Sequence, residues 1–290
     1  PGTQLAYNSD PTKPDQLTVA LNGGIGRNVN YVVDGGDNTD DTIGGALQNY
    51  SLEGVEGVKI QSQQYKAEYG RSTGGVMSVS SKTGTNEFHG SVHANFRSDS
   101  LNSKTETERT NNVDKAAYDR KQYGFSLGGP IIKDKIHYFV AYDKTDRETS
   151  HIVGTDPRGP LPRNFPEQQA TAVPLPFKDD LVTAKVTWQV NPRQLVQLRY
   201  GYQKNTGKYG AAPIYTPDSL GTLENKYNSI LVGHQWTLKG GMLNEFLFQY
   251  SKFNNFITSD STNPSLYFPS GVAAGQNFNT PQSTEQVKYQ

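Results

Sequence analysis

Residues 51–86 read SLEGVEGVKIQSQQYKAEYGRSTGGVMSVSSKTGTN, and this stretch decides the fold. An apolar segment at 55–60 and an alternating apolar/small segment at 76–80 predict two strands. Gly70 and the pair Gly74-Gly75 lie between them, and glycine permits positive φ and a close approach of the backbone. The stretch therefore predicts a strand, a glycine-rich bend, a second strand and a turn.

The same residues resemble the end of the plug domain in TonB-dependent outer-membrane transporters. In that family an IExIEVxxG run leads to YGxxxxGGVxxVxTKxGxNxFHG. The matching residues are Val55, Val58, Ile60, Tyr69, Gly70, Gly74, Gly75, Val76, Val79, Lys82, Gly84, Asn86, Phe88, His89 and Gly90. The resemblance covers about the first half of the chain, and Val33-Asp34-Gly35 with FSLGGPIIKD at 125–134 looks most like the Oar-like branch. It implies a structural plug motif formed by Tyr69, Gly70, Gly74, Gly75, Lys82 and Gly84.

The composition narrows the class of protein. The chain has 290 residues with 28 basic and 28 acidic side chains, so nothing indicates a basic face for nucleic acid. Only 33% of residues are hydrophobic, yet there are 17 Tyr, 12 Phe and 29 Gly, which suits a β-barrel with a polar interior and aromatic girdles. A partly disordered secreted β protein is the alternative. The absence of cysteine excludes disulfides and thiolate metal sites.

Strict alternation of apolar and polar residues begins after residue 87. Period-two runs of this kind predict strands that are apolar on one face only. The predicted outward faces carry Val92, Ala94, Phe96; Tyr123, Phe125, Leu127; Ile136, Tyr138, Val140, Tyr142; Val182, Ala184, Val186, Trp188, Val190; Val196, Leu198, Tyr200, Tyr202; Ile230, Val232, Trp236, Leu238; and Phe246, Phe248, Tyr250. The alternate residues Thr183, Lys185, Gln197 and Arg199 are expected to line a polar lumen.

The connections between these strands alternate in length. Short ones at 129–135, 191–194 and 239–242 separate long polar stretches near 98–120, 145–178, 205–223 and 254–283. Outer-membrane barrels have this pattern, with short periplasmic turns and long external loops. A soluble sandwich has no reason to place every long loop at one end.

The predicted fold is mainly β: a small mixed plug domain followed by antiparallel transmembrane β-barrel strands. We expect residues 1–86 to be the C-terminal part of the plug and residues 87–290 to supply the first seven to eight strands. Plugged outer-membrane transporters have about 22 strands, so the sequence predicts a partial barrel and a fragment of a longer chain. A small closed barrel of about eight strands is the alternative, but its interior is too narrow for such a plug.

Two groups of residues are candidate ligand contacts. The acidic loop contributes Asp37, Asn38, Asp40 and Asp41, and its oxygen ligands suit calcium, although the spacing does not fit an EF-hand. Tyr209 and Tyr215 lie in predicted external loops, where aromatic rings stack on sugars or peptides. The commoner interpretations are a solvated turn for the loop and loop packing for the tyrosines. No other cofactor is expected.

Two sequence patterns resemble enzyme or metal sites, but neither has the spacing or the structural context that such a site requires. Gly70-Arg71-Ser72-Thr73-Gly74 matches the G-x-S-x-G elbow of a hydrolase, but that elbow requires a helix after the serine and a β pattern follows here. His89 and His93 would lie about 13 Å apart on one strand face, too far to share a metal. We therefore predict a non-enzyme.

The resemblance implies a ligand-gated pore in the outer membrane of a Gram-negative bacterium. The implied partners are the TonB energy-transducing complex, reached through a segment not in this chain, together with outer-membrane lipid and lipopolysaccharide, an unknown ligand and an outer-membrane accessory protein. Nucleic acid is not expected. A passive, adhesive or scaffolding surface β protein without transport is the runner-up, and a soluble secreted β domain is a third interpretation.

Overall fold

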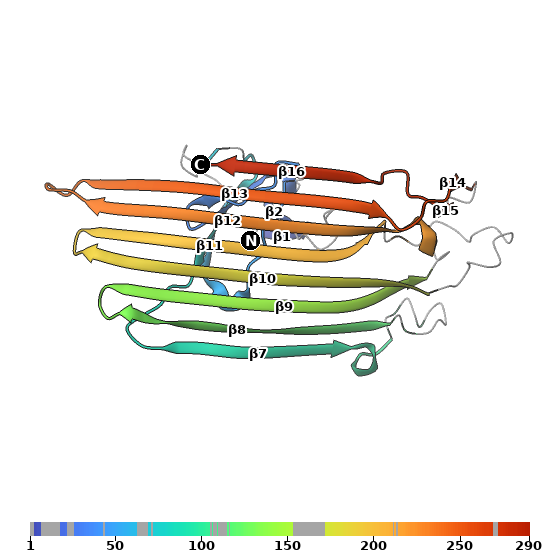
Figure 1. Cartoon of the computed structure of the whole chain (residues 1–290), viewed down its shortest axis with the longest axis horizontal. Helices are drawn as coiled ribbons and strands as arrows, with labels where there is room; N and C mark the ends of the chain where they lie inside the picture. The colour runs from blue at the N-terminus through green and yellow to red at the C-terminus, as the bar shows by residue number, and fades with distance from the viewer. Residues whose placement is uncertain are drawn as a thin grey trace.

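The computed structural model describes residues 3–6, 18–21, 26–42, 44–62, 69–70, 72–104, 106, 109, 115, 117–152, 172–210, 212, 214–268 and 272–290. Eight of the strands form one antiparallel sheet in the order β16-β13-β12-β11-β10-β9-β8-β7 (Figure 1). They are β7 (His89–Ser98), β8 (Tyr118–Ile132), β9 (Ile136–Ile152), β10 (Ala172–Asn191), β11 (Gln194–Tyr209), β12 (Gly221–Thr237), β13 (Leu243–Ser259) and β16 (Gln282–Tyr289). We call this sheet the wall. The mainly β, antiparallel partial barrel predicted from the sequence is confirmed.

The pairing register shows which face of the wall each residue occupies. Val186 lies opposite both Tyr138 and Leu198, and directly opposed residues of an antiparallel pair point to the same side. Leu198 is 45% exposed on the face away from the small sheet described below, whereas the neighbouring row contains the buried Lys185 and Arg199. The predicted outward direction of the aliphatic and aromatic faces is therefore confirmed.

Several wall strands are longer than the sequence predicted. β10 begins at Ala172 and β11 continues to Tyr209, inside stretches expected to be loops. A transmembrane strand needs only about 9–11 residues, so 16 to 20 residues extend well past the membrane. At the loop ends of β10 and β11 the outward face is polar, so the apolar alternation stops while the backbone pairing continues. The predicted boundaries of these loops were wrong for that reason.

A second, four-stranded sheet has the order β4-β3-β6-β5. β3 (Val29–Val33) pairs in parallel with β6 (Gly75–Ser81), whereas β4 (Gly36–Asp37) and β5 (Val55–Gln61) pair antiparallel with their neighbours. Figure 1 shows this sheet behind the wall, against one of its faces. We call residues 26–81 the plug; a domain boundary at residue 86 stays a prediction.

Short elements complete the described chain. They are the strands β1 (Thr3–Ala6), β2 (Thr18–Leu21), β14 (Leu266–Tyr267) and β15 (Ala273–Ala274), and the 3-10 turns η1 (Gly26–Asn28), η2 (Leu52–Gly54), η3 (Asp99–Leu101) and η4 (Pro217–Ser219). No helix among the described residues is long and apolar enough to cross a membrane.

The hydrophobic core of the plug is small. Its residues Val29 and Tyr31 form a buried cluster with Leu21 of the neighbouring β2, and Met77 packs against them. Val32, Val33, Leu47 and Val76 are buried as well, and Leu47 is clustered with Tyr227 and Phe253 of the wall. Each large buried side chain stabilises the fold by roughly 1.5–3 kcal/mol. The plug therefore depends on its contacts with the wall.

The predicted bend before β6 is confirmed. β6 begins directly at Gly75, whose φ is +146°, so no helix follows Ser72. The Ser72 hydroxyl oxygen accepts a hydrogen bond of 2.8 Å from the Gly75 amide, which fixes the bend. The hydrolase elbow is thus not formed, and Ser72 acts as a structural brace.

Candidate functional site: the contact between plug and wall

Asp34 lies where the plug contacts β10 and β11, the two middle strands of the wall. β3 and β4 form a hairpin whose two turn residues, Asp34 and Gly35, have φ values of 48° and 89°. An Asp-Gly pair favours this turn because Gly, and to a lesser degree Asp, tolerate positive φ. The turn projects the Asp34 carboxylate toward the inner face of β10 and β11.

Asp34 forms a buried ion-pair triad with two wall cations. Its Oδ1 lies 3.3 Å from Lys185 Nζ, and its Oδ2 lies 3.3 Å from Arg199 Nη1. The three side chains are 5%, 7% and 1% exposed. Ser81, at the end of β6, donates to the same carboxylate from its amide at 2.9 Å and from its hydroxyl at 2.6 Å. Arg199 also donates to the Val33 carbonyl at 2.6 Å.

The charges around Asp34 control its protonation. Burial alone would raise the pKa of Asp34, but Lys185, Arg199 and the hydrogen bonds from Ser81 outweigh burial and lower the pKa below its ordinary value. The carboxylate is therefore ionised throughout the physiological range. Since the plug supplies the anion and the wall supplies both cations, this charge triad joins the two parts of the molecule directly.

We expect the contribution of Asp34 to plug docking to be constant at neutral pH and lost only in acid. A group whose pKa is lowered on folding stabilises the folded state above its unfolded pKa, about 3.9, and loses this contribution as the pH falls through the lowered value. The measurement is hydrogen exchange of the plug from pH 7 down to pH 3, comparing the wild type with Asp34→Asn. If the difference in plug exchange rate between the two proteins disappeared between pH 5 and 7, this would contradict a lowered pKa for Asp34.

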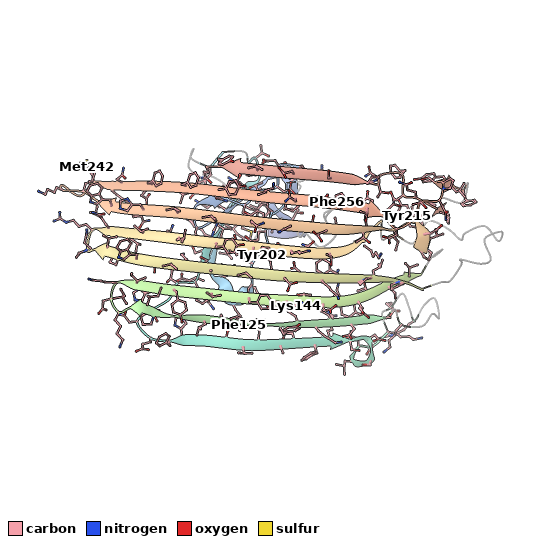
Figure 2. All side chains as sticks on the ribbon, in the orientation of Figure 1. Phe125, Lys144, Tyr202, Tyr215, Met242 and Phe256 are labelled. Atoms are coloured by element: carbon pink, nitrogen blue, oxygen red, sulfur yellow. The ribbon has the colours of Figure 1, made fainter. Side chains whose placement is uncertain are left out.

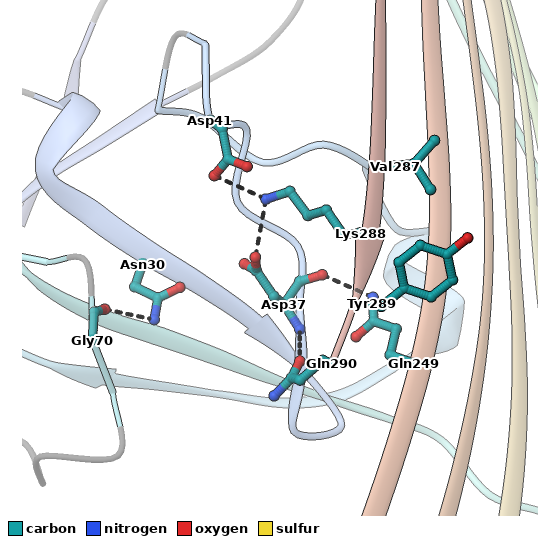
Figure 3. A pocket seen from close by; sticks show the side chains of 9 residues that line it. All are labelled: Asn30, Asp37, Asp41, Gly70, Gln249, Val287, Lys288, Tyr289 and Gln290. Carbon is teal, nitrogen blue, oxygen red and sulfur yellow. Dashed lines mark hydrogen bonds and ion pairs between the residues drawn. The ribbon is translucent and has the colours of Figure 1, made fainter.

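A second charged contact joins the acidic loop to β16 (Figure 3). Lys288 Nζ lies 2.9 Å from Asp37 Oδ2 and 3.0 Å from Asp41 Oδ1. The Asp37 amide donates to the side chain of Gln290 at 2.9 Å, and Gln249 donates to the Asp37 carbonyl at 2.8 Å. A pocket of about 380 Å³ lies beside this contact, bounded by the plug and by β13 and β16.

Closely packed neutral groups fill the contact between these two charged sites. Gly201 faces Gln48, and a Cβ at position 201 would lie 2.4 Å from the Gln48 amide oxygen, so a larger residue there would have to displace the Gln48 amide. The Asn49 amide donates to the side chain of Gln203 at 2.9 Å. Leu47 packs with the wall aromatics Tyr227 and Phe253. Apart from the Leu47 cluster, the side chains that join plug and wall here are polar or charged.

The acidic-loop candidates occupy three different environments. Asp37 and Asp41 converge on the Lys288 ammonium group. Asn38 is buried and braces the loop, donating to the Gln48 carbonyl at 2.9 Å. Asp40 Oδ1 accepts hydrogen bonds from Thr42 and from Gln286 of the wall.

The calcium site predicted on this loop stays a prediction. Within the described residues no three or more His, Cys, Asp or Glu side chains are grouped to hold a metal ion. Lys288 already supplies positive charge to Asp37 and Asp41, so calcium would have to displace it. The geometry therefore favours a protein ammonium group at this position.

The two tyrosines do not present free rings. Tyr209 is the last residue of β11, buried with Leu223 and Ile257, so its predicted position in a loop was wrong. Its hydroxyl accepts a hydrogen bond of 2.8 Å from Asn279. Tyr215 packs against the Val173 and Leu220 cluster. Both contribute to packing at the loop end of the wall, and a ligand role for them stays a prediction.

The plug-motif residues mark close backbone approaches. The Gly70 carbonyl accepts a hydrogen bond from Asn30, and Tyr69 precedes it, partly exposed. A Cβ at Gly74 would lie 2.9 Å from the Asn28 carbonyl oxygen. The Lys82 amide donates to the Gly54 carbonyl, and a Cβ at Gly84 would lie 2.1 Å from the Tyr138 carbonyl oxygen of the wall.

Sequence reasoning missed the most important contacts. The sequence analysis used Asp34 only as part of the Val33-Asp34-Gly35 resemblance and did not predict its contact with the wall. Asp-Gly is nevertheless a strong signal for a hairpin turn. Lys288 was missed as well, although Gln286, Lys288 and Gln290 alternate with Val287 and Tyr289 in the segment expected to begin an eighth strand. Alternation identifies the inward residues, but it does not say which of them meet the plug.

Comparison with known proteins finds similarity to outer-membrane β-barrels, in agreement with the fold described above. Residues 80–164 match a family model described as an outer membrane beta barrel domain. Over 142 residues, 48% of this chain, the sequence is 36% identical to the TonB-dependent transporter Oar of Myxococcus xanthus, covering 13% of that protein. The resemblance to the Oar-like branch is thus confirmed.

Solved structures share the fold. The siderophore receptor PirA from Acinetobacter baumannii superposes with a TM-score of 0.63 at 18% identity, over 100% of this chain and 41% of that one. The outer membrane transporter YddB from Escherichia coli superposes with a TM-score of 0.69 at 11% identity, over 99% and 40%. The chain spans about two fifths of the length of these barrels and a smaller share of Oar.

Proposed function

We propose that this chain is part of a TonB-dependent transporter of the Gram-negative outer membrane, and that it supplies a movable plug together with the wall surface on which the plug docks; its similarity to a TonB-dependent transporter and to an outer membrane beta barrel domain supports the proposal. The observation that carries the proposal is the buried triad of Asp34, Lys185 and Arg199. It joins plug to wall by charge and hydrogen bonds, in an interface with few apolar contacts. A contact of this kind releases without leaving an apolar surface in water.

The transport cycle follows from this arrangement. A ligand binds the external face of the plug and loops, and the TonB complex pulls on the plug. The force breaks the charged contacts at Asp34 and at Lys288, so that the plug shifts and a path opens along the wall. No covalent chemistry is part of this proposal, and the similarity to transporters and receptors supports a protein that is not an enzyme.

Locking the plug to the wall tests the proposal. A Cβ at Gly54, in the plug, would lie 3.4 Å from the Cβ of Ala141 in β9, close to the separation in a disulfide. The chain has no cysteine, so Gly54→Cys with Ala141→Cys introduces a single pair within these residues. We expect the oxidised double variant to lose transport and a reductant to restore it.

A matched control places a disulfide within the wall. Ser229 and Ser251 lie directly opposite each other in β12 and β13, so the pair Ser229→Cys with Ser251→Cys leaves the plug free. Because the ligand is unknown, the readout is mass spectrometry of compounds taken up or released only by energised cells that contain the full-length protein. If the oxidised and the reduced Gly54→Cys/Ala141→Cys proteins transported equally well, the proposal that the plug moves would be wrong.

The same experiment separates transport from the runner-up, a passive surface protein. A passive adhesive or scaffold works equally well with its plug fixed, so its surface function is insensitive to the Gly54–Ala141 bridge. The plug packed against the polar inner face of the wall supports the transporter, because a passive surface protein has no need for a charged, separable plug.

A further inference from the structure

A linker joins the plug to the wall, and it is fastened to the hairpin of β8 and β9. Residues 82–88 connect β6 of the plug with β7, which lies beside β8 at one edge of the wall (Figure 2). The Lys82 amide still donates to the Gly54 carbonyl of the plug. A Cβ at Gly84 would already lie 2.1 Å from the Tyr138 carbonyl oxygen of β9. The chain therefore leaves the plug at Lys82 and reaches the wall at Gly84.

Asn86 of the linker is held by hydrogen bonds to the short turn between β8 and β9. Its side-chain NH2 group donates to Asp134 Oδ1 at 2.5 Å, and its side-chain oxygen accepts from the Asp134 amide at 2.8 Å. The same oxygen lies 2.8 Å from His137 Nε2, and because a carbonyl oxygen only accepts, the imidazole donates. Asp134 has a φ of 61°, a left-handed conformation that Asp and Asn tolerate better than most residues. We call Asn86, Asp134 and His137 the clasp.

Phe88 and His89, just after the clasp residue of the linker, pack on opposite faces of β8. His89 lies opposite Gly128 in the register of β7 and β8, and successive residues of a strand point to opposite sides. A Cβ at Gly128 would lie 2.8 Å from His89 Nε2, and a Cβ at Gly129 would lie 2.3 Å from Phe88 Cδ1. The two glycines thus leave room for one ring on each face. On the inner face the His89 ring stacks on the buried Phe139, with ring centroids 6.5 Å apart.

The clasp is separate from the charge triad that holds the plug. Asn86 is bonded to a turn of the wall, whereas Asp34 of the plug is bonded to Lys185 and Arg199 on β10 and β11. Breaking the charge triad therefore removes none of the hydrogen bonds of the clasp. Thr83 lies between the last plug contact of the linker and its first wall contact, so a displaced plug and a fixed linker would meet at this residue.

We propose that the clasp, together with Phe88 and His89, is a fixed anchor at which movement of the plug ends. The plug moves as far as Thr83, and the linker beyond it stays on the wall. The inference rests on the proposed function, because an anchor limits movement only if the plug moves, but the attachment itself is present in the docked protein. It also gives a physical role to two stretches of the sequence, since NEFHG at 86–90 and GGPIIKD at 128–134 form the two sides of one contact.

Exchanging the two side chains of the clasp tests the attachment. Asn86→Asp keeps the shape of the side chain but sets a carboxylate against the Asp134 carboxylate, so a hydrogen bond becomes a repulsion. Amide hydrogen exchange of the linker and of the β8–β9 turn in the full-length protein should then become about tenfold faster. Adding Asp134→Asn again places an amide against a carboxylate, and Asn accepts the φ of 61°, so the double variant should restore slow exchange.

Asn191→Asp is the matched control, because it makes the same substitution in the turn between β10 and β11. There the Asn191 side-chain oxygen accepts from the Arg193 amide at 2.9 Å, a bond that a carboxylate oxygen keeps, so exchange of the linker should not change. Unchanged exchange in the Asn86→Asp protein, equal acceleration in the control, or no recovery in the double variant would each overturn the clasp.

Pulling on the plug tests whether its movement ends at the clasp. In the full-length protein held in a lipid bilayer, a single-molecule force measurement applies tension through Gly57→Cys, at an open position of β5. The chain from residue 57 to residue 84 spans at most roughly 100 Å, so we expect extension to stop within that length at a peak of force. The peak should fall to a lower force in the Asn86→Asp protein and recover in the double variant.

The outcomes of the pulling experiment separate the anchor from the transport proposal. Extension past this limit without a peak would overturn the anchor, and so would an equal peak in the Asn86→Asp protein. Extension that stops as expected, in a protein whose transport is insensitive to the Gly54→Cys/Ala141→Cys bridge, would support the anchor and overturn the proposed function.

Discussion

Replacing Asp34 with Asn is expected to release the plug from the wall while leaving the wall folded. Asn tolerates the positive φ of the turn and keeps the size of the side chain, so the change removes the charge and replaces one acceptor oxygen with an NH2 donor that none of the neighbouring donors can use. Lys185 and Arg199 then remain buried without their anion. Breaking a buried pair in this way costs about 3–5 kcal/mol. The amides of β3 should exchange with solvent faster by on the order of a hundredfold or more in the full-length protein.

Two companion variants make the Asp34 result interpretable. Asp37→Asn removes a charge from the more exposed pair with Lys288, where solvent screens the interaction, and should change exchange much less. Adding Lys185→Met and Arg199→Met to Asp34→Asn removes the uncompensated cations and should recover much of the protection. Unchanged exchange of β3 in the Asp34→Asn protein would contradict the role of the triad.

Replacing Gly75 with Val is expected to disrupt the plug itself. The φ of Gly75 is +146°, a conformation that side-chain-bearing residues rarely adopt. A Cβ there would also lie 2.5 Å from Leu21 Cδ1 and 2.6 Å from the Gln61 carbonyl oxygen. Strain and overpacking together cost roughly 2–6 kcal/mol, which is large for a plug with so small a core. Thermal unfolding followed by proteolysis should show early loss of the plug while the wall stays intact.

Gly57 provides the matched control for Gly75. It lies in β5 of the same sheet, and a Cβ at this position meets nothing within 4 Å. Gly57→Val should therefore leave plug protection close to that of the wild type. If the two valine variants behave alike, then the backbone geometry at Gly75 is not what holds the bend.

Much of the fold was predictable because alternation is a local signal. The outward row containing Leu198 and Val186 and the inward row containing Arg199 and Lys185 follow from period two alone. The bend at Gly74-Gly75 was predictable because only glycine fits its backbone. The ends of the strands were not, since the strands continue beyond the lipid, where Tyr209 and its neighbours give no apolar alternation.

The site itself depends on contacts that no local pattern contains. Asp34 meets Lys185 and Arg199 across more than 150 residues of sequence, and Lys288 meets Asp37 across still more. The acidic loop looked like a cation site because its carboxylates are close in sequence. Its partner cation comes from β16, at the far edge of the wall, and only the three-dimensional arrangement brings them together.

Disulfide trapping in isolated outer membranes tests most directly whether the plug lies against the polar inner face of the wall. The measurement is the yield of the intramolecular bridge in the Gly54→Cys/Ala141→Cys protein after mild oxidation, with Ser229→Cys/Ser251→Cys as the positive control within the wall. The docked plug predicts near-complete bridging of both pairs. Bridging of the control pair with no bridge between Gly54→Cys and Ala141→Cys would contradict the docked arrangement and the transport proposal that depends on it.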